Sequence, residues 1–94
     1  MNRPPNRSSA TEAQPATDVV AARVDARGLL CPLPILLAAR EIAKLPPGGR
    51  LVVEGDDLGI LADLPAWCAE TGHRLVEIGE AGGLVRGVVE KAGR

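Results

Sequence analysis

The chain has 94 residues, which is enough for one domain, and its net charge is -1. Hydrophobic residues make up 46% and charged residues 24%, which is sufficient for a packed core. The balanced charge and the single aromatic residue argue against nucleic-acid binding, because they offer neither a basic surface nor side chains to stack on bases. Two cysteines cannot form a disulfide-rich secreted scaffold, and no apolar run approaches the roughly 18 residues of a membrane helix. We therefore expect a cytoplasmic protein without membrane or direct nucleic-acid contacts.

The amino-terminal segment differs in composition from the rest of the chain. Residues 1–17 are rich in proline and polar residues and contain no valine, isoleucine or leucine, so they cannot bury apolar area. We predict a disordered tail over residues 1–17 and a folded domain over residues 18–94. The tail lacks the apolar region of a secretory signal, and a transit peptide is supported only by Arg3 and Arg7 in a short, non-amphipathic run.

The first half of the predicted domain alternates a strand, a helix and a second strand. Residues 19–26 are short and rich in valine, which predicts a strand. Residues 32–45 repeat apolar side chains at helical spacing, and the Pro-Pro-Gly-Gly run at 46–49 ends that helix. The apolar run at 51–53 predicts the second strand, after which Asp57 suits the N-cap of another helix.

The second half adds a helix and a hairpin. Residues 58–71 predict a helix that ends at Gly72 as its C′ residue, and Pro65 should kink this helix or displace its start. Residues 74–78 and 84–91 predict two strands that pair as a hairpin. The expected apolar face of the helix consists of Leu61, Leu64, Cys68 and Thr71. The order β-α-β-α-β-β predicts an α/β (α+β) two-layer sandwich, with a four-stranded mixed sheet and two helices on one face.

The candidate chemistry lies at Cys31, in the segment that joins the first strand to the first helix. Pro32 suits the first helical position, which would make Cys31 the N-cap and leave the N–H of Leu33 free near the sulfur. The positive end of the helix dipole would then lower the pKa of the Cys31 thiol. Pro32 and Pro34 would stiffen the loop around it. From the residues alone, a reactive thiol and a buried, inert one are equally supported.

The segment around Cys31 also resembles a known family. Residues 25–34, Asp-Ala-Arg-Gly-Leu-Leu-Cys-Pro-Leu-Pro, are similar to the Cys-Pro-x-Pro signature of the TusA/SirA-like sulfur-carrier family. The resemblance extends over about residues 19–91 and includes Gly48-Gly49, residues 53–57 ending in Asp-Asp, residues 63–68 and residues 72–75. The motifs occur in the family's order, which makes the resemblance specific.

The resemblance implies both a fold and a function. It implies the same β-α-β-α-β-β sandwich, and a Cys31 that accepts sulfane sulfur as a persulfide and relays it. The implied partners are a donor cysteine desulfurase or rhodanese-like protein and a downstream sulfur-acceptor protein. Such a protein is a carrier with a persulfide-forming cysteine rather than a stand-alone enzyme, and it needs no cofactor. Pro32, Pro34 and Gly28 would form the frame of the site.

Two residues beside the cysteine depart from the family's namesake. Leu30 stands where the namesake has a basic residue, and Leu33 where it has a glutamate, which leaves open whether this chain serves the namesake's transfer-RNA pathway. Leu29, Leu30 and Leu33 would form an apolar rim around the sulfur that suits docking of a partner protein. One of Leu29 and Leu30 is nevertheless expected to pack in the core. Asp25 and Arg27 are further candidate docking residues.

The remaining candidate residues favour structural roles. Cys68 is expected to be a buried thiol, because a resolving role would require it to lie close to Cys31. The spacing of these cysteines and His73 matches no structural zinc site, so we expect no metal. His73 is expected to be a strand-edge or capping residue. The alternative function is a thiol-redox or regulatory interaction module that uses the same Cys31.

Overall fold

Short valine-rich runs form the strands and longer segments with a helical apolar repeat form the helices, in the predicted order. The computed structural model describes residues 20–93, so the predicted boundary between tail and domain at residues 17 and 18 lies outside the described residues. The strands are β1 (Val20–Asp25), β2 (Arg50–Gly55), β3 (Arg74–Ala81) and β4 (Leu84–Glu90), and the helices are α1 (Leu33–Ile42) and α2 (Ile60–Thr71).

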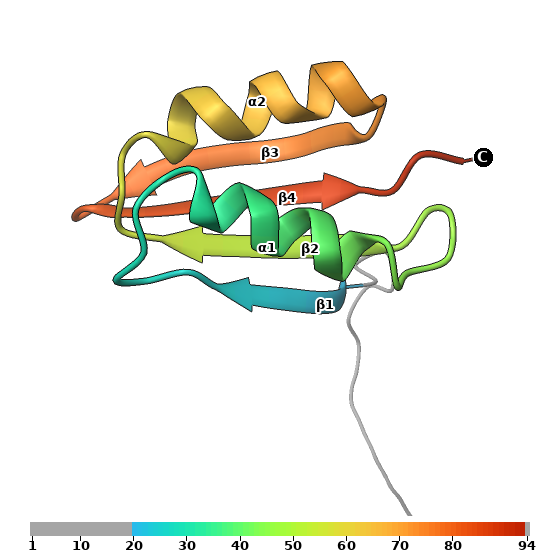
Figure 1. Ribbon diagram of the computed structural model, residues 1–94, viewed down its shortest axis with the longest axis horizontal. Helices are drawn as coiled ribbons and strands as arrows, with labels where there is room; N and C mark the ends of the chain where they lie inside the picture. Colours follow the sequence, from blue (N-terminus) through green and yellow to red (C-terminus); the bar gives the residue numbers. More distant parts are fainter. Residues whose placement is uncertain (1–19, 94) are drawn as a thin grey trace, which may run out of the picture.

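The four strands form one mixed sheet in the order β1-β2-β4-β3 (Figure 1). Strand β1 runs parallel to β2, whereas β4 is antiparallel to both β2 and β3. A parallel pair needs a long crossover, which α1 supplies between β1 and β2. As a result, the carboxyl ends of β1 and β2 lie at the same edge of the sheet.

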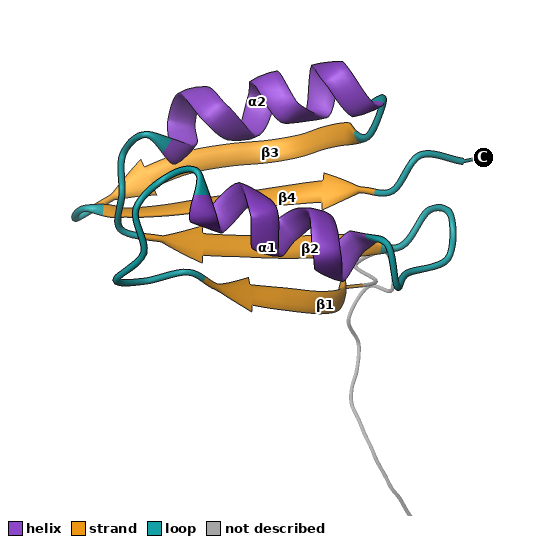
Figure 2. Cartoon of the chain, in the orientation of Figure 1, coloured by secondary structure: helices purple, strands orange, loops and turns teal. Residues whose placement is uncertain are grey.

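Both helices cover the same face of the sheet, which confirms the predicted two-layer sandwich (Figure 2). Helix α1 packs on β1 and β2, and α2 packs on β3 and β4. The core lies between the layers and contains Val24, Ala26, Ile35, Ala38, Ile42, Leu51, Val53, Ile60, Leu64, Cys68, Val85 and Val89. Within residues 20–93, no helix is long and apolar enough to cross a membrane.

The buried face of α2 differs from the predicted one. Ile60, Leu64 and Cys68, spaced four residues apart, point into the core, whereas Leu61 is 39% exposed and Thr71 is exposed. The face of α2 that packs on the sheet is therefore the one with Ile60, rather than the one with Leu61. Pro65 lies inside α2 rather than at its start. Gly72 ends the helix as predicted, in the left-handed conformation, and its N–H donates to the carbonyl of Cys68 at 2.9 Å.

The observed ends of α1 and β3 differ from the predicted ones, and local residues explain both differences. Helix α1 ends at Ile42, and a tighter turn leads to Pro46, because the residue before a proline disfavours the helical conformation. Strand β3 continues past the predicted end at residue 78 to Ala81. Gly82 and Gly83 both adopt positive φ and make a two-residue hairpin turn, so the ladder extends to the pair Ala81 and Leu84.

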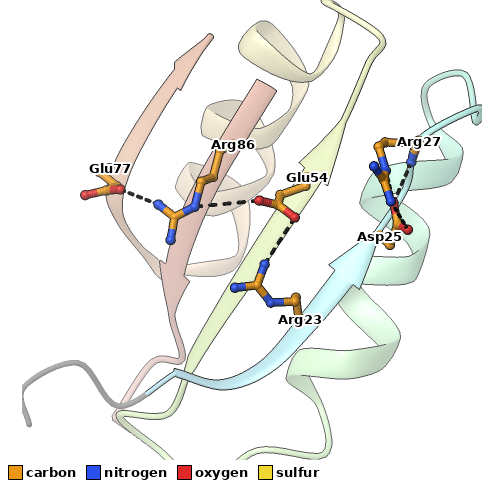
Figure 3. Close-up of polar contacts among 6 residues, drawn as sticks. All are labelled: Arg23, Asp25, Arg27, Glu54, Glu77 and Arg86. Atoms are coloured by element: carbon orange, nitrogen blue, oxygen red, sulfur yellow. Dashed lines mark hydrogen bonds and ion pairs between the residues drawn. The ribbon is translucent and has the colours of Figure 1, made fainter. Parts of the chain in front are cut away.

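The opposite face of the sheet carries a ladder of charged side chains (Figure 3). The ladder consists of Arg23, Glu54, Arg86 and Glu77. Its closest contact joins Arg86 Nη1 to Glu77 Oε2 at 2.7 Å. Val52 and Val88 pair with each other in the middle of this face and are nonetheless buried. The long side chains therefore shield the apolar strand centres where no helix covers them.

Candidate functional site

Cys31 belongs to the loop between β1 and α1. Figure 1 shows this loop at the edge of the sheet where both parallel strands end. The loop between β2 and α2 begins at the same edge, because β1 and β2 are parallel neighbours. In open sheets, ligands and reactive groups collect beyond the carboxyl ends of such strands. The topology therefore brings residues 26–32 and residues 56–59 together around the cysteine.

The start of α1 differs from the prediction and changes the surroundings of the sulfur. Pro32, not Cys31, is the N-cap, and α1 begins at Leu33. The N–H of Leu33 is not free, because it donates to the carbonyl of Leu30 at 2.9 Å. The N–H groups of Ile35 and Leu36 both donate to the carbonyl of Pro32. Cys31 thus precedes the helix by two residues, and no unpaired N–H group of its first turn serves the thiol.

The loop is held by two aspartates that follow β2. Asp57 accepts the backbone N–H of Cys31 at 2.7 Å with Oδ2 and that of Gly59 at 3.0 Å with Oδ1. Asp56 accepts the N–H of Gly28 at 3.0 Å. Asp57 was predicted to cap α2, but α2 begins at Ile60 with Gly59 as its N-cap. Asp57 therefore joins the two loops and fixes the backbone on the amino side of the cysteine.

Three residues near Cys31 in the chain were predicted to frame the site. Gly28 has a φ of +86°, which only glycine adopts readily, so the chain can turn sharply after β1. Pro32 follows the cysteine through a cis peptide bond and is exposed, whereas Pro34 is fully buried and anchors the first turn of α1. Gly28 and Pro34 thus restrict the backbone three residues before and three residues after Cys31, and their role as a frame stays a prediction.

The electrostatic environment raises the pKa of the Cys31 thiol to about 11, which contradicts the predicted lowering. Partial burial is the largest cause, because it disfavours the charged thiolate. The carboxylates of Asp63 and Asp57 add to it, because both lie close enough to the sulfur to disfavour a negative charge there. The prediction was wrong because it considered only the helix end and not the acidic groups that the second loop brings in.

Exposed leucines lie on the segments before and after the half-buried cysteine and at the start of α2. Leu30 is 71% exposed and Leu33 is 48% exposed, whereas Leu29 is partly buried against the core, as expected for one of the two neighbours. The second loop and the start of α2 contribute Leu58, at 55%, and Leu61. This leucine rim gives the edge an apolar surface of the kind that contacts other proteins.

The two charged docking candidates pair with each other rather than with the site. Arg27 donates to both carboxylate oxygens of Asp25 at 2.9 Å, and this ion pair lowers the pKa of Asp25 to about 2. Both side chains are exposed. They lie at the start of the Cys31 loop, and their charges largely cancel.

A groove adjoins the site between the two helices. It has a volume of about 310 Å³ and is lined by Pro32, Ile35, Asp63, Ala66, Trp67 and Glu70. A larger hollow of about 560 Å³ lies at the β3–β4 hairpin and includes none of the predicted site residues. Of these two hollows, only the one between the helices contains residues that also contact Cys31.

The remaining candidates have structural positions. Cys68 is a free thiol buried in the core, and burial raises its pKa, in agreement with the predicted structural role. His73 precedes β3 and accepts the N–H of Ala92 at 2.9 Å through Nδ1, which agrees with a capping role. Within residues 20–93, no three His, Cys, Asp or Glu side chains gather as a metal site.

Sequence reasoning missed Asp63 and misread Asp57. The signal for Asp57 was present, because an Asp-Asp pair directly follows a strand that was expected to lie beside the first one. Asp63 opens the family-like segment at residues 63–68, but that resemblance did not place it at the sulfur, because its approach depends on how α2 packs beside α1.

Comparisons with known proteins agree on one family. A family model described as Sulfurtransferase TusA matches residues 22–91. A protein of Neisseria meningitidis serogroup A is 40% identical over 67 residues, which are 71% of this chain and 90% of that protein. The Sulfur carrier protein TusA of Pseudomonas aeruginosa strain PAO1 is 40% identical over 67 residues, 71% of this chain and 85% of that protein.

A solved structure shares the fold. The crystal structure of a SirA-like protein from Desulfitobacterium hafniense matches with a TM-score of 0.67 and 23% identity, over 76% of this chain and 97% of that one. The family model covers most of the chain, and both relatives are 40% identical over 71% of it. The chain therefore belongs to the sulfurtransferase TusA family.

Proposed function

We propose that this protein is a sulfur carrier that holds sulfane sulfur as a persulfide on Cys31 and relays it between two proteins. Membership of the TusA family, whose relatives are named sulfur carriers, supports the carrier role. The observation that carries the assignment to Cys31 is its position. It is a free, half-buried cysteine in a loop fixed by Asp57 and bordered by exposed leucines, whereas Cys68 is enclosed in the core.

The transfer reaction moves one sulfur atom without net oxidation. The Cys31 thiol loses its proton, and the thiolate attacks the outer sulfur of a persulfide on the donor protein. A new S–S bond forms at Cys31 while the donor's own S–S bond breaks, and the donor leaves as a thiolate that takes up a proton. In the delivery step, a thiolate of the acceptor attacks the outer sulfur of the Cys31 persulfide. The S–S bond at Cys31 breaks, and Cys31 leaves as a thiolate that takes up a proton.

A carrier of this kind needs an accessible thiol and a docking surface rather than a deep pocket. The rigid frame of Gly28, Pro32 and Pro34 supports the first requirement, because it holds the cysteine at the edge of the sheet. The exposed side chains of Leu30 and Leu33 support the second. Asp25 and Arg27 lie at the start of the same loop and form the charged border of the proposed docking surface.

The proposed partners are a cysteine desulfurase or a rhodanese-like protein as donor, and a sulfur-acceptor protein downstream. The proposed location is the cytoplasm, where thiols are kept reduced and Cys31 stays available. The chemistry needs no cofactor, because the partners supply and consume the sulfur.

Intact-mass spectrometry after sulfur loading tests the assignment. Reduced wild type, Cys31→Ser and Cys68→Ala would be incubated with a cysteine desulfurase and cysteine, and separately with a rhodanese and thiosulfate. We expect wild type and Cys68→Ala to gain one sulfur atom that dithiothreitol removes, and Cys31→Ser to gain none. Cys68→Ala is the matched control, because it removes the other thiol and keeps the surface unchanged.

Two outcomes would contradict the proposal. Loading that persists in Cys31→Ser would assign the sulfur to another residue. The absence of any adduct from either donor, with Cys31 still open to alkylation, would favour the thiol-redox alternative.

A further inference from the structure

The groove between the helices combines an apolar floor with an acidic border. Ile35 of α1 and Ala66 and Trp67 of α2 provide apolar surface, and the border includes the carboxylates of Asp63 and Glu70. The two carboxylates are seven residues apart, so they lie two turns apart on one face of α2. We call this feature the α1–α2 groove, and it fits a side chain that has both an apolar stem and a charged end.

The charge of this border is unopposed. Among residues 20–93, neither Asp63 nor Glu70 takes part in an ion pair, and the lining of the α1–α2 groove includes no basic side chain. The carboxylate of Asp57, by contrast, accepts hydrogen bonds from two backbone N–H groups. Negative charge therefore accumulates on the side of the cysteine that faces α2.

Several basic side chains of residues 20–93 bind groups outside the α1–α2 groove. Arg27 pairs with Asp25 at the start of the Cys31 loop. Arg86 belongs to the ladder on the opposite face of the sheet, and Lys91 binds the carbonyls of residues 43 and 45 beyond the far end of α1. Arg40 of α1 takes part in no ion pair among residues 20–93, but it does not line the α1–α2 groove. Within residues 20–93, the lining of the groove therefore supplies no cation that balances its two carboxylates.

The α1–α2 groove is continuous with the proposed sulfur site. Pro32, which follows the cysteine, forms part of its lining. Asp63 borders the groove, and its carboxylate is also close enough to Cys31 to raise the pKa of the thiol. A group bound at Asp63 is therefore close enough to change the charge that the sulfur experiences.

We propose that the α1–α2 groove receives a segment of a partner protein that presents an arginine or lysine side chain to Asp63 and Glu70. The proposal rests on the sulfur-carrier function and specifies the chemistry of its partner. The stem of the basic side chain packs on Ile35, and its charged end can also stack on the ring of Trp67. The leucine rim contacts the rest of the partner.

Docking of a cation would also assist the transfer step. In the free protein, burial raises the pKa of the Cys31 thiol most, and the carboxylates of Asp63 and Asp57 raise it further, so the thiol stays protonated. A bound cation offsets this charge, favours loss of the thiol proton and reduces the repulsion of a negatively charged donor persulfide. The same contact therefore contributes binding and activation, and the thiol stays unreactive between partners.

The first test compares loading by a donor protein with loading by a small molecule. The donor that loads wild type would be assayed with Asp63→Asn, Glu70→Gln and the double variant. Glu41→Gln is the control, because it removes one negative charge outside the α1–α2 groove, as each single variant does within it. We expect the double variant to load about tenfold more slowly from the protein donor. Loading from inorganic polysulfide should be equal or faster in Asp63→Asn, because this donor does not use the groove.

The second test is independent of sulfur transfer. Trp67 is the single tryptophan of the chain, so its fluorescence reports on the α1–α2 groove. A short synthetic peptide with one arginine between two leucines should change this fluorescence in wild type and Glu41→Gln but not in the double variant. Added salt should weaken the response.

The results separate this proposal from the carrier function. Equal loading of wild type and the double variant from the protein donor, with equal salt dependence, would overturn the groove proposal and leave the carrier function intact. Failure of every donor to load wild type would overturn the carrier function. In that case, the peptide titration alone decides the groove proposal, and an unchanged Trp67 signal would overturn it.

Discussion

The backbone N–H of Cys31 donates a hydrogen bond to Oδ2 of Asp57, 26 residues later in the chain, at 2.7 Å. The other oxygen of this carboxylate holds the N–H of Gly59. One side chain thus ties the loop that carries the cysteine to the start of α2, which carries Asp63. The position of the sulfur and the charge around it depend on the same contact between two loops.

Removal of this link should loosen the site. Asp57→Asn keeps the size of the side chain but cannot accept both N–H groups, since one end of the amide is itself a donor. We expect a lower urea midpoint of unfolding and faster hydrogen exchange at the Cys31 amide. Asp56→Asn is the comparison, because it disturbs only the bond to Gly28. Equal exchange at the Cys31 amide in wild type and Asp57→Asn would refute the positioning role.

The reactivity of the Cys31 thiol should increase with pH up to about its raised pKa of 11. The thiol pKa is raised to about 11 by burial and by Asp63 and Asp57, so only a small fraction is thiolate near neutral pH. Its rate of alkylation by iodoacetamide should rise about tenfold per pH unit between roughly pH 7 and 10. In Asp63→Asn the loss of a negative charge lowers the thiol pKa, so the rate at fixed pH should increase. A rate that levels off below pH 9 in wild type would contradict the raised pKa.

The contact between α2 and the sheet requires a glycine in β4. A Cβ added at Gly87 would lie 2.5 Å from Leu64 Cδ2, in the middle of the core. Gly87→Ala should therefore lower the free energy of unfolding by about 1–3 kcal/mol, as overpacking does. Gly79→Ala in β3 is the matched control, because a Cβ there meets no atom within 4 Å. Equal stability of both variants in urea would show that α2 can shift to accommodate the extra carbon.

Cys68 should matter for stability and not for sulfur transfer. Its side chain is 4% exposed and packs in the core with Leu64. Cys68→Ala should lower the free energy of unfolding by about 1–2 kcal/mol, because a small cavity replaces the sulfur. Its rate of sulfur loading should equal that of wild type at a temperature well below the unfolding midpoint. Slower loading there would give Cys68 a part in the transfer.

The sequence alone determined the order of the elements and the two-layer architecture, and the family resemblance made Cys31 the candidate site. These features follow from local signals, since apolar periodicity marks strands and helices, and Gly28, Pro32 and Pro34 restrict the backbone where they stand. The family resemblance of residues 25–34 rests on the same local information. The buried position of Cys68 could also be predicted, because it lies on an apolar face of its helix.

Only the tertiary structure decided the environment of the sulfur. The parallel pairing of β1 and β2 brings the loop with Asp57 beside the loop with Cys31, and the packing of α2 beside α1 places Asp63 at the thiol. Both carboxylates are distant in sequence, so the local pattern predicted a lowered thiol pKa where the fold raises it. Electrostatic interactions act through space, and the sign of the charge beside a residue is set by which segments the fold brings together.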